Sequence, residues 1–92
     1  MGQNYPNPFN PSTTITYTLE PVTRGAARST IRIYGIDGRL VTTLVDRVQD
    51  PGRYTATWNG RDAGGNAVAS GIYFCEMSYG GAKETRKVTL LK

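Results

Sequence analysis

The chain has 92 residues, enough for one domain with a thin core, because a chain of this size buries only about 60 to 65% of its unfolded surface. It has no histidine and one cysteine, Cys75, which excludes Ser-His-Asp and Cys-His catalytic sets, an internal disulfide and paired-cysteine metal motifs. The net charge of +4, with arginines scattered along the chain, argues against the dense basic stripe of a nucleic-acid-binding protein.

The chain opens on a segment rich in proline. Pro6, Pro8 and Pro11 fix φ and lack the amide hydrogen that a helix interior or a central strand needs. We therefore predict a stiff entry segment or linker over residues 1–11, followed by a single domain over residues 12–92.

No run of the sequence approaches the roughly 18 apolar residues that a membrane span requires. The start of the chain also lacks the charged and then apolar pattern of a signal peptide. We expect no transmembrane segment. If the protein is exported, its signal lies upstream in a longer parent.

Alternation with a period of two begins after the entry segment. Ile15, Tyr17 and Leu19 fall on one face and threonines on the other, which predicts a half-buried strand. Ile31 and Ile33 mark a second strand in the same way.

Two turns divide the middle of the chain. Asp37-Gly38 supplies the positive φ of a tight hairpin, and we expect a third strand from Arg39 to Val45. Asp50-Pro51-Gly52 then predicts a second turn, because proline presets φ and glycine tolerates the left-handed region.

The clearest alternation comes next, with Tyr54, Ala56 and Trp58 on one face of a fourth strand. A polar loop without periodicity runs from Asn59 to Asn66, and a short strand over residues 67–69 is left open.

The last third of the chain predicts a hairpin. The run from Ser70 to Met77 is apolar on both faces, which is typical of a central strand covered on both sides. Gly80-Gly81 turns the chain, and Val88 and Leu90 alternate with polar residues in a closing strand.

Short strands separated by turns, with no helical periodicity, predict an all-β fold. We expect an immunoglobulin or fibronectin-III-like β-sandwich of about seven antiparallel strands without a disulfide, and a small barrel is the alternative. The expected core is Ile15, Tyr17, Leu19, Ile31, Ile33, Tyr54, Trp58, Tyr73, Cys75, Val88 and Leu90.

Few residues offer chemistry. Cys75 lies in an apolar run, where a small buried hydrophobe is expected, and the seven carboxylates mostly flank turns. We therefore predict no enzyme activity and no cofactor or metal.

The loop from Asn59 to Asn66 offers oxygens to calcium but lacks the acidic spacing of a calcium loop, so turn formation is favoured. Trp58, Tyr54 and Tyr73 form either a sugar-stacking platform or, as their alternation favours, part of the core.

Several motifs together carry a family resemblance that runs from Gln3 to Lys92. They are Gln3-Asn4-Tyr5-Pro6-Asn7-Pro8-Phe9-Asn10-Pro11-Ser12-Thr13, Ile33-Tyr34 with Gly38-Arg39 and Val41, Gly52 with Tyr54 to Trp58-Asn59-Gly60, and Ser70-Gly71-Ile72-Tyr73-Phe74. This set resembles the type A C-terminal sorting domains of the type IX (Por) secretion system. The stretch from Trp58 to Phe74 also resembles the immunoglobulin-like domain of the flagellar hook-capping protein, which has a scaffolding role.

The first resemblance implies a C-terminal sorting signal that directs a covalently attached cargo protein across the outer membrane. The implied partners are the secretion translocon and its sorting peptidase, with no nucleic acid, and we expect a monomer. The implied location is the periplasm in transit, then the cell exterior or outer-membrane surface. The implied recognition residues are Pro6, Asn7, Pro8, Phe9, Gly38, Arg39, Gly52, Tyr54, Gly71, Tyr73, Lys87 and Lys92. The alternatives are an accessory carbohydrate-binding domain and a structural scaffold or spacer domain.

Overall fold

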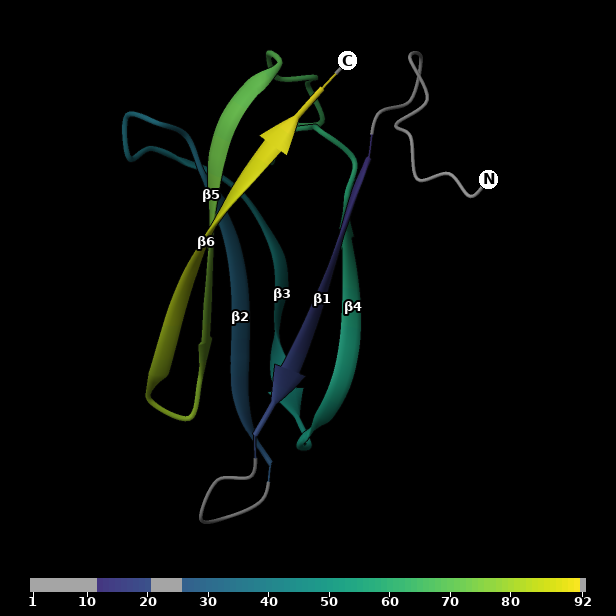
Figure 1. The fold of residues 1–92 in the computed structure, drawn as a ribbon, viewed down its shortest axis with the longest axis vertical. Coiled ribbons are helices and arrows are strands. Elements are labelled where there is room, and N and C mark those ends of the chain that lie inside the picture. The colour runs from purple at the N-terminus through teal and green to yellow at the C-terminus, as the bar shows by residue number, and fades with distance from the viewer. Residues whose placement is uncertain (1–11, 21–25, 92) are drawn as a thin grey trace.

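The computed structural model describes residues 12–20 and 26–91. Within them the chain forms six strands: β1 (Thr13–Leu19), β2 (Ala27–Tyr34), β3 (Leu40–Gln49), β4 (Gly52–Trp58), β5 (Gly71–Tyr79) and β6 (Ala82–Leu90). One sheet has the order β3-β2-β5-β6 and the other is the pair β1-β4, and every pairing is antiparallel. Figure 1 shows the two layers. The all-β sandwich prediction is confirmed.

The two-residue alternation decides which face of each strand is buried. In β1, Ile15, Tyr17 and Leu19 are buried while the intervening threonines are exposed. β4 lies beside β1 with Ile15 opposite Ala56 and Tyr17 opposite Tyr54, so both strands of the small sheet turn their apolar residues to the same side.

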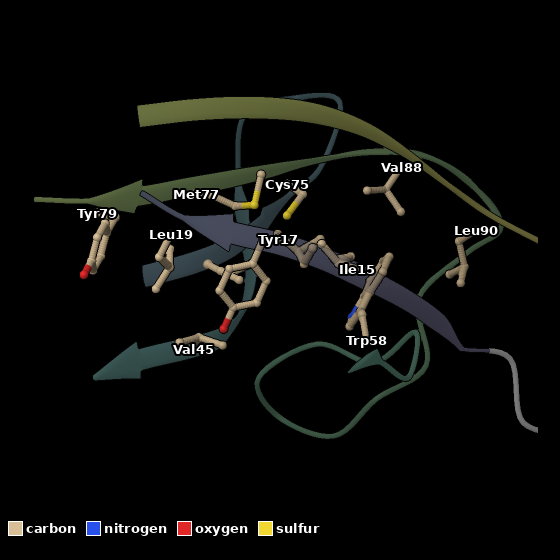
Figure 2. Packing of buried hydrophobic residues seen from close by; sticks show 12 residues of the cluster. Ile15, Tyr17, Leu19, Val45, Trp58, Cys75, Met77, Tyr79, Val88 and Leu90 are labelled. Carbon is tan, nitrogen blue, oxygen red and sulfur yellow. The ribbon is translucent and has the colours of Figure 1, made fainter. Parts of the chain in front are cut away.

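The core lies between the two sheets. Figure 2 shows its side chains converging from β1 on one side and from β5 and β6 on the other. The buried apolar residues are Ile15, Tyr17, Leu19, Ile31, Ile33, Val45, Trp58, Cys75, Met77, Tyr79, Val88 and Leu90. All the residues expected in the core are therefore buried except Tyr54 and Tyr73, which are partly buried and pack against its margin.

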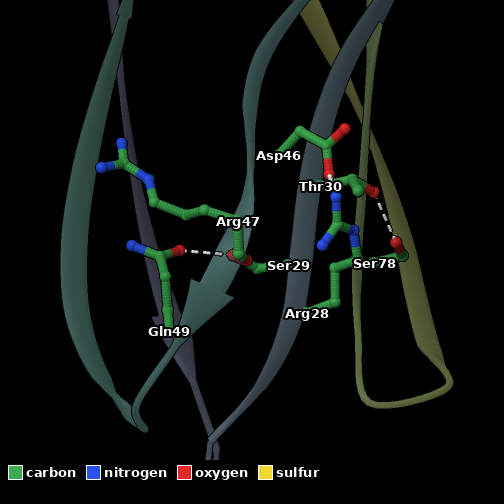
Figure 3. A network of polar contacts seen from close by, with 7 residues as sticks. All are labelled: Arg28, Ser29, Thr30, Asp46, Arg47, Gln49 and Ser78. Carbon is green, nitrogen blue, oxygen red and sulfur yellow. Dashed lines mark hydrogen bonds and ion pairs between the residues drawn. The ribbon is translucent and has the colours of Figure 1, made fainter.

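A small polar network closes the core where β2 begins and β3 ends. The Ser29 hydroxyl, which is buried, donates to the Gln49 side-chain oxygen and lies 3.2 Å from the Arg47 carbonyl oxygen. On the other side of β2, Thr30 and Ser78 share a hydrogen bond of 2.6 Å (Figure 3). Each buried hydroxyl therefore has a partner, which removes the cost of its desolvation.

Three strand predictions need correction. Residues 67–69 form no strand, only a bridge between Arg61 and Ala67, so the described chain has six strands and not about seven. β3 runs on to Gln49, because residues 45–49 pair in unbroken register with residues 31–27 of β2 although the apolar alternation ends at Val45.

The third correction concerns β5, which is covered on one face only. β5 is central, between β2 and β6, as predicted. However, Ile72 on its outer face is 42% exposed and Phe74 is partly exposed, because the small sheet covers only the inner face. No helix in the described part of the chain has the length and apolarity to cross a membrane.

Candidate interaction surface

The residues implied in recognition lie at both ends of the sandwich. Gly38 and Arg39 lie in or beside the turn between β2 and β3, and Gly71 begins β5 at that same end, because Tyr34 pairs with both Leu40 and Phe74. We call this the turn end (Figure 1, top).

Gly52 and Tyr54 begin β4 at the opposite end, so these recognition residues do not gather at one site. Pro6, Asn7, Pro8, Phe9 and Lys92 lie outside the described residues. The boundary between a linker over 1–11 and a domain over 12–92 stays a prediction.

Gly38 has a structural role in its turn. Its φ of +84° lies in the left-handed region, its amide donates to the Gly35 carbonyl at 3.0 Å, and the Gly35 amide donates to the Arg39 carbonyl at 2.9 Å. The Asp37 carboxylate also accepts a hydrogen bond from the Arg39 amide at 3.0 Å. This turn therefore needs glycine for backbone reasons alone.

The three aromatic residues of the possible sugar platform are held by structural contacts. Trp58 is only 1% exposed, meets Tyr73 edge to face at 5.0 Å and donates from Nε1 to the Arg61 carbonyl at 3.0 Å. Tyr54 stacks on Tyr17 at 5.6 Å. Because the Trp58 ring is enclosed, it offers no face on which a sugar can stack.

The loop from Asn59 to Asn66 uses its side-chain oxygens for its own backbone. One carboxylate oxygen of Asp62 accepts from the amides of Gly64 at 3.0 Å and Asn66 at 2.9 Å. The Asn59 side-chain oxygen accepts from the Arg61 amide at 3.1 Å. These are the contacts of a turn-forming loop.

Cys75 is fully buried in the middle of β5. Burial raises the pKa of its thiol to about 11, and the nearby Arg86 opposes this more weakly. The thiolate is therefore scarce at neutral pH, and the side chain serves as a small hydrophobe.

The turn end carries an apolar surface that sequence reasoning missed. Leu40, Tyr34 and Phe74 lie in one row across the large sheet, because Tyr34 pairs with Leu40 on one side and with Phe74 on the other. Ile36, Leu40, Ile72 and Leu91 are 76%, 49%, 42% and 61% exposed. We call this set the turn-end patch: Tyr34, Ile36, Leu40, Ile72, Phe74 and Leu91.

Positive charge flanks this patch. Lys87 of β6 lies opposite Phe74 in the same row, and Arg39 precedes Leu40. Neither side chain forms an ion pair with any residue described. In the sequence, the patch corresponds in part to the apolar residues on the outer face of β5. The sequence alone predicts that these residues belong to a strand covered on both faces.

Comparison with known proteins identifies relatives of the fold. The family model of the FlgD Ig-like domain matches residues 10–83. A structure of FlgD from P. aeruginosa is similar over 86% of this chain and 60% of that chain, with 21% identity and a TM-score of 0.63. A structure of FlgD from Xanthomonas campestris is similar over 86% of this chain and 67% of that chain, with 20% identity and a TM-score of 0.51.

The chain thus spans 60% of the length of the P. aeruginosa protein. No curated protein sequence matches it. The resemblance to the immunoglobulin-like domain of the flagellar hook-capping protein is confirmed, whereas the motif over residues 3–9 lies before the matched region. Since the family model covers most of the chain, this protein belongs to the FlgD Ig-like domain family.

Proposed function

We propose that this chain is a non-enzymatic structural module, a scaffold or spacer domain that holds neighbouring parts of an assembly in place. Membership of the FlgD Ig-like domain family supports this role, and the X. campestris FlgD structure is described as giving insights into the hook capping that is essential for flagellar assembly. The observation that carries the proposal is the turn-end patch at one end of the large sheet.

The remaining polar side chains support a role without catalysis. Asp46 pairs with Arg28 at 2.9 Å, and Glu84 pairs with Arg86 at 3.1 Å. Asp37 and Asp62 accept hydrogen bonds from turn amides. Carboxylates that are bound to arginines or to turn amides do not form the acid and base pair that general acid–base catalysis requires.

The composition of the patch suits a protein partner. Aromatic and aliphatic side chains provide apolar area, while Arg39 and Lys87 at its border provide charge, as in interfaces with an apolar centre and a polar rim. The domain therefore fits a partner with an apolar contact bordered by acidic residues.

A second candidate function is the type IX sorting signal, and the entry motif favours it. The run Tyr5-Pro6-Asn7-Pro8-Phe9-Asn10-Pro11 has no role in a scaffold interpretation. In this candidate the chain ends a cargo protein, meets the translocon and sorting peptidase, and passes from the periplasm to the cell surface or exterior.

An export assay separates the two functions. Residues 1–92 are fused behind a signal peptide and a reporter, and expressed in cells with type IX machinery and in matched cells without the translocon. A scaffold leaves the reporter in the periplasm of both strains. Reporter outside the cell only when the translocon is present would overturn the scaffold proposal and establish sorting.

A deletion in the parent protein provides the complementary test. Removing residues 12–92 is expected to leave export of the parent unchanged while its assembly with neighbouring proteins is lost. Lost export with intact assembly would contradict the scaffold proposal.

A further inference from the structure

The sandwich is open along one side, between β1 and β6. These two strands border different sheets and are not paired with each other as neighbouring strands. Two grooves lie between them. One, of about 340 Å³, is lined by residues 17–20, which form the last part of β1 and the residue after it. The other, of about 280 Å³, is lined by residues 13–16 in the first part of β1. Arg86 lines both grooves. Together they follow the full length of β1.

One hydrogen bond between the two strands is described across the opening. It comes from Arg86, whose Nη1 donates to the Thr16 carbonyl at 3.0 Å. Figure 2 shows Cys75, Met77 and Val88 facing β1 across this side of the core.

The backbone of β1 is available on this side. The Thr16 carbonyl points toward β6, so Thr16 directs its backbone groups away from β4. In an antiparallel pair this orientation repeats every second residue, so Thr14 and Thr18 do the same.

The backbone of β6 faces the opening in a similar way. The two-residue turn Gly80-Gly81, with φ of +55° and +91°, makes Tyr79 and Ala82 the hydrogen-bonded closing pair of the hairpin. Counting on from Ala82, the backbone groups of Lys83, Thr85, Lys87 and Thr89 point away from β5 and into the opening.

Among these edges, β1 lacks the features that protect edge strands from pairing. β3 carries two register shifts against β2. β6 carries Lys83 and Lys87 outside and the charged pair of Glu84 and Arg86 inside. β1 has no charge, no proline and an unbroken register with β4. Bulges and charges usually protect sheet edges from pairing with further strands. Because β1 has neither, its edge can pair with an additional strand.

We propose that an extended, proline-free segment of another protein inserts between β1 and β6 as an additional strand. Its apolar side chains alternate inward against Met77 and Val88, and its acidic side chains face outward beside Lys83 and Lys87. It displaces the hydrogen bond of Arg86 to Thr16, and a carboxylate near the opening replaces that partner. This strand-acceptor site does not rest on the function proposed above, although Lys87 also borders the turn-end patch.

The chain itself does not supply this strand. Pro6, Pro8 and Pro11 lack the amide hydrogens that a central strand needs. The β1 strand of a second copy has no acidic residue, and its β6 strand would bring Lys83 and Lys87 against the same cations.

Among the described cations that line the grooves, Lys83 lies 3.9 Å from a Glu76 carboxylate oxygen and Arg86 pairs with Glu84. Lys87 has no such partner among the described residues, so it is the cation that favours an acidic segment from another protein.

A peptide titration of the 92-residue chain tests the site. The probe is a proline-free synthetic peptide in which valine alternates with glutamate, and the control has the same composition in two blocks. We expect saturable binding of the alternating peptide only, measured by calorimetry, with slower hydrogen exchange at the Thr14 and Thr18 amides. Equal binding of both peptides, or unchanged exchange at these amides, would overturn the proposal.

Two variants localise the binding. Lys87→Glu is expected to weaken it about tenfold, while Arg53→Glu on β4, which changes the net charge equally, leaves it unchanged. Thr16→Pro removes an outward amide and is expected to abolish binding, provided that its unfolding transition stays cooperative. Unchanged affinity in Lys87→Glu, or a peptide-free dimer through β1 in sedimentation analysis, would contradict the assignment.

Discussion

Trp58→Ala is expected to destabilise the domain by about 3–5 kcal/mol. The ring is enclosed, packs edge to face on Tyr73 and donates to the Arg61 carbonyl. The substitution thus removes the largest fully buried side chain and leaves the carbonyl without its donor. Small domains have a total stability of about 5–15 kcal/mol, so much of the variant is expected to unfold near 37 °C.

The measurement is urea unfolding followed by far-UV circular dichroism, because the variant has no tryptophan fluorescence. Trp58→Phe is the control: it keeps an aromatic ring in the site while it loses the bond to Arg61 and part of the volume. Its loss of stability is expected to be clearly smaller. A Trp58→Ala midpoint equal to that of the natural sequence would mean that the ring is not in the core.

Leu90→Ala is expected to cost about 2–5 kcal/mol, whereas Leu91→Ala changes stability by less than about 0.5 kcal/mol. Leu90 is 1% exposed at the end of β6, and the next residue, Leu91, is 61% exposed. The two variants delete the same atoms one residue apart, so only the direction of the side chain distinguishes them.

Thermal unfolding of both variants under identical conditions measures this difference. The expected result is a midpoint many degrees lower for Leu90→Ala and an unchanged midpoint for Leu91→Ala. Equal shifts in the two variants would show that the closing strand has a different register from the one described.

The alternation of apolar residues predicted most of the fold because the core is a property of one face of each strand. Ile15, Tyr17 and Leu19 in β1 and Val88 and Leu90 in β6 repeat every second residue, and each is buried. The turn at Gly38 could also be predicted from the sequence, because glycine adopts a positive φ that other residues adopt at a cost in free energy.

Other features depend on tertiary contacts and were missed for that reason. The extension of β3 beyond Val45 arises from backbone pairing of residues 46–49 with β2, and these mostly polar residues carry no alternation that would signal it. Ile72 is exposed and Phe74 is partly exposed because no described layer covers the outer face of the large sheet. The sequence of a strand with two apolar faces is the same whether its outer face is covered or exposed.

The candidate surfaces were even less accessible to sequence reasoning. Gly38 forms a turn hydrogen bond and Gly52 begins β4. The hydroxyls of Tyr54 and Tyr73 donate to nearby backbone carbonyls. These structural roles show that a family motif does not by itself mark a binding site. The bond from Arg86 to Thr16 joins residues separated by 70 positions, and only the sandwich brings them together.

The account depends on a four-stranded sheet and a two-stranded sheet that leave one edge of β1 open. Residue-resolved amide hydrogen exchange of the unliganded domain tests this directly. The amides of Ile33 and Cys75, in strands paired on both sides, are expected to exchange only through global unfolding, and those of Thr14 and Thr18 much faster. Equal protection at all four amides would mean that β1 is paired on both edges, which contradicts the account.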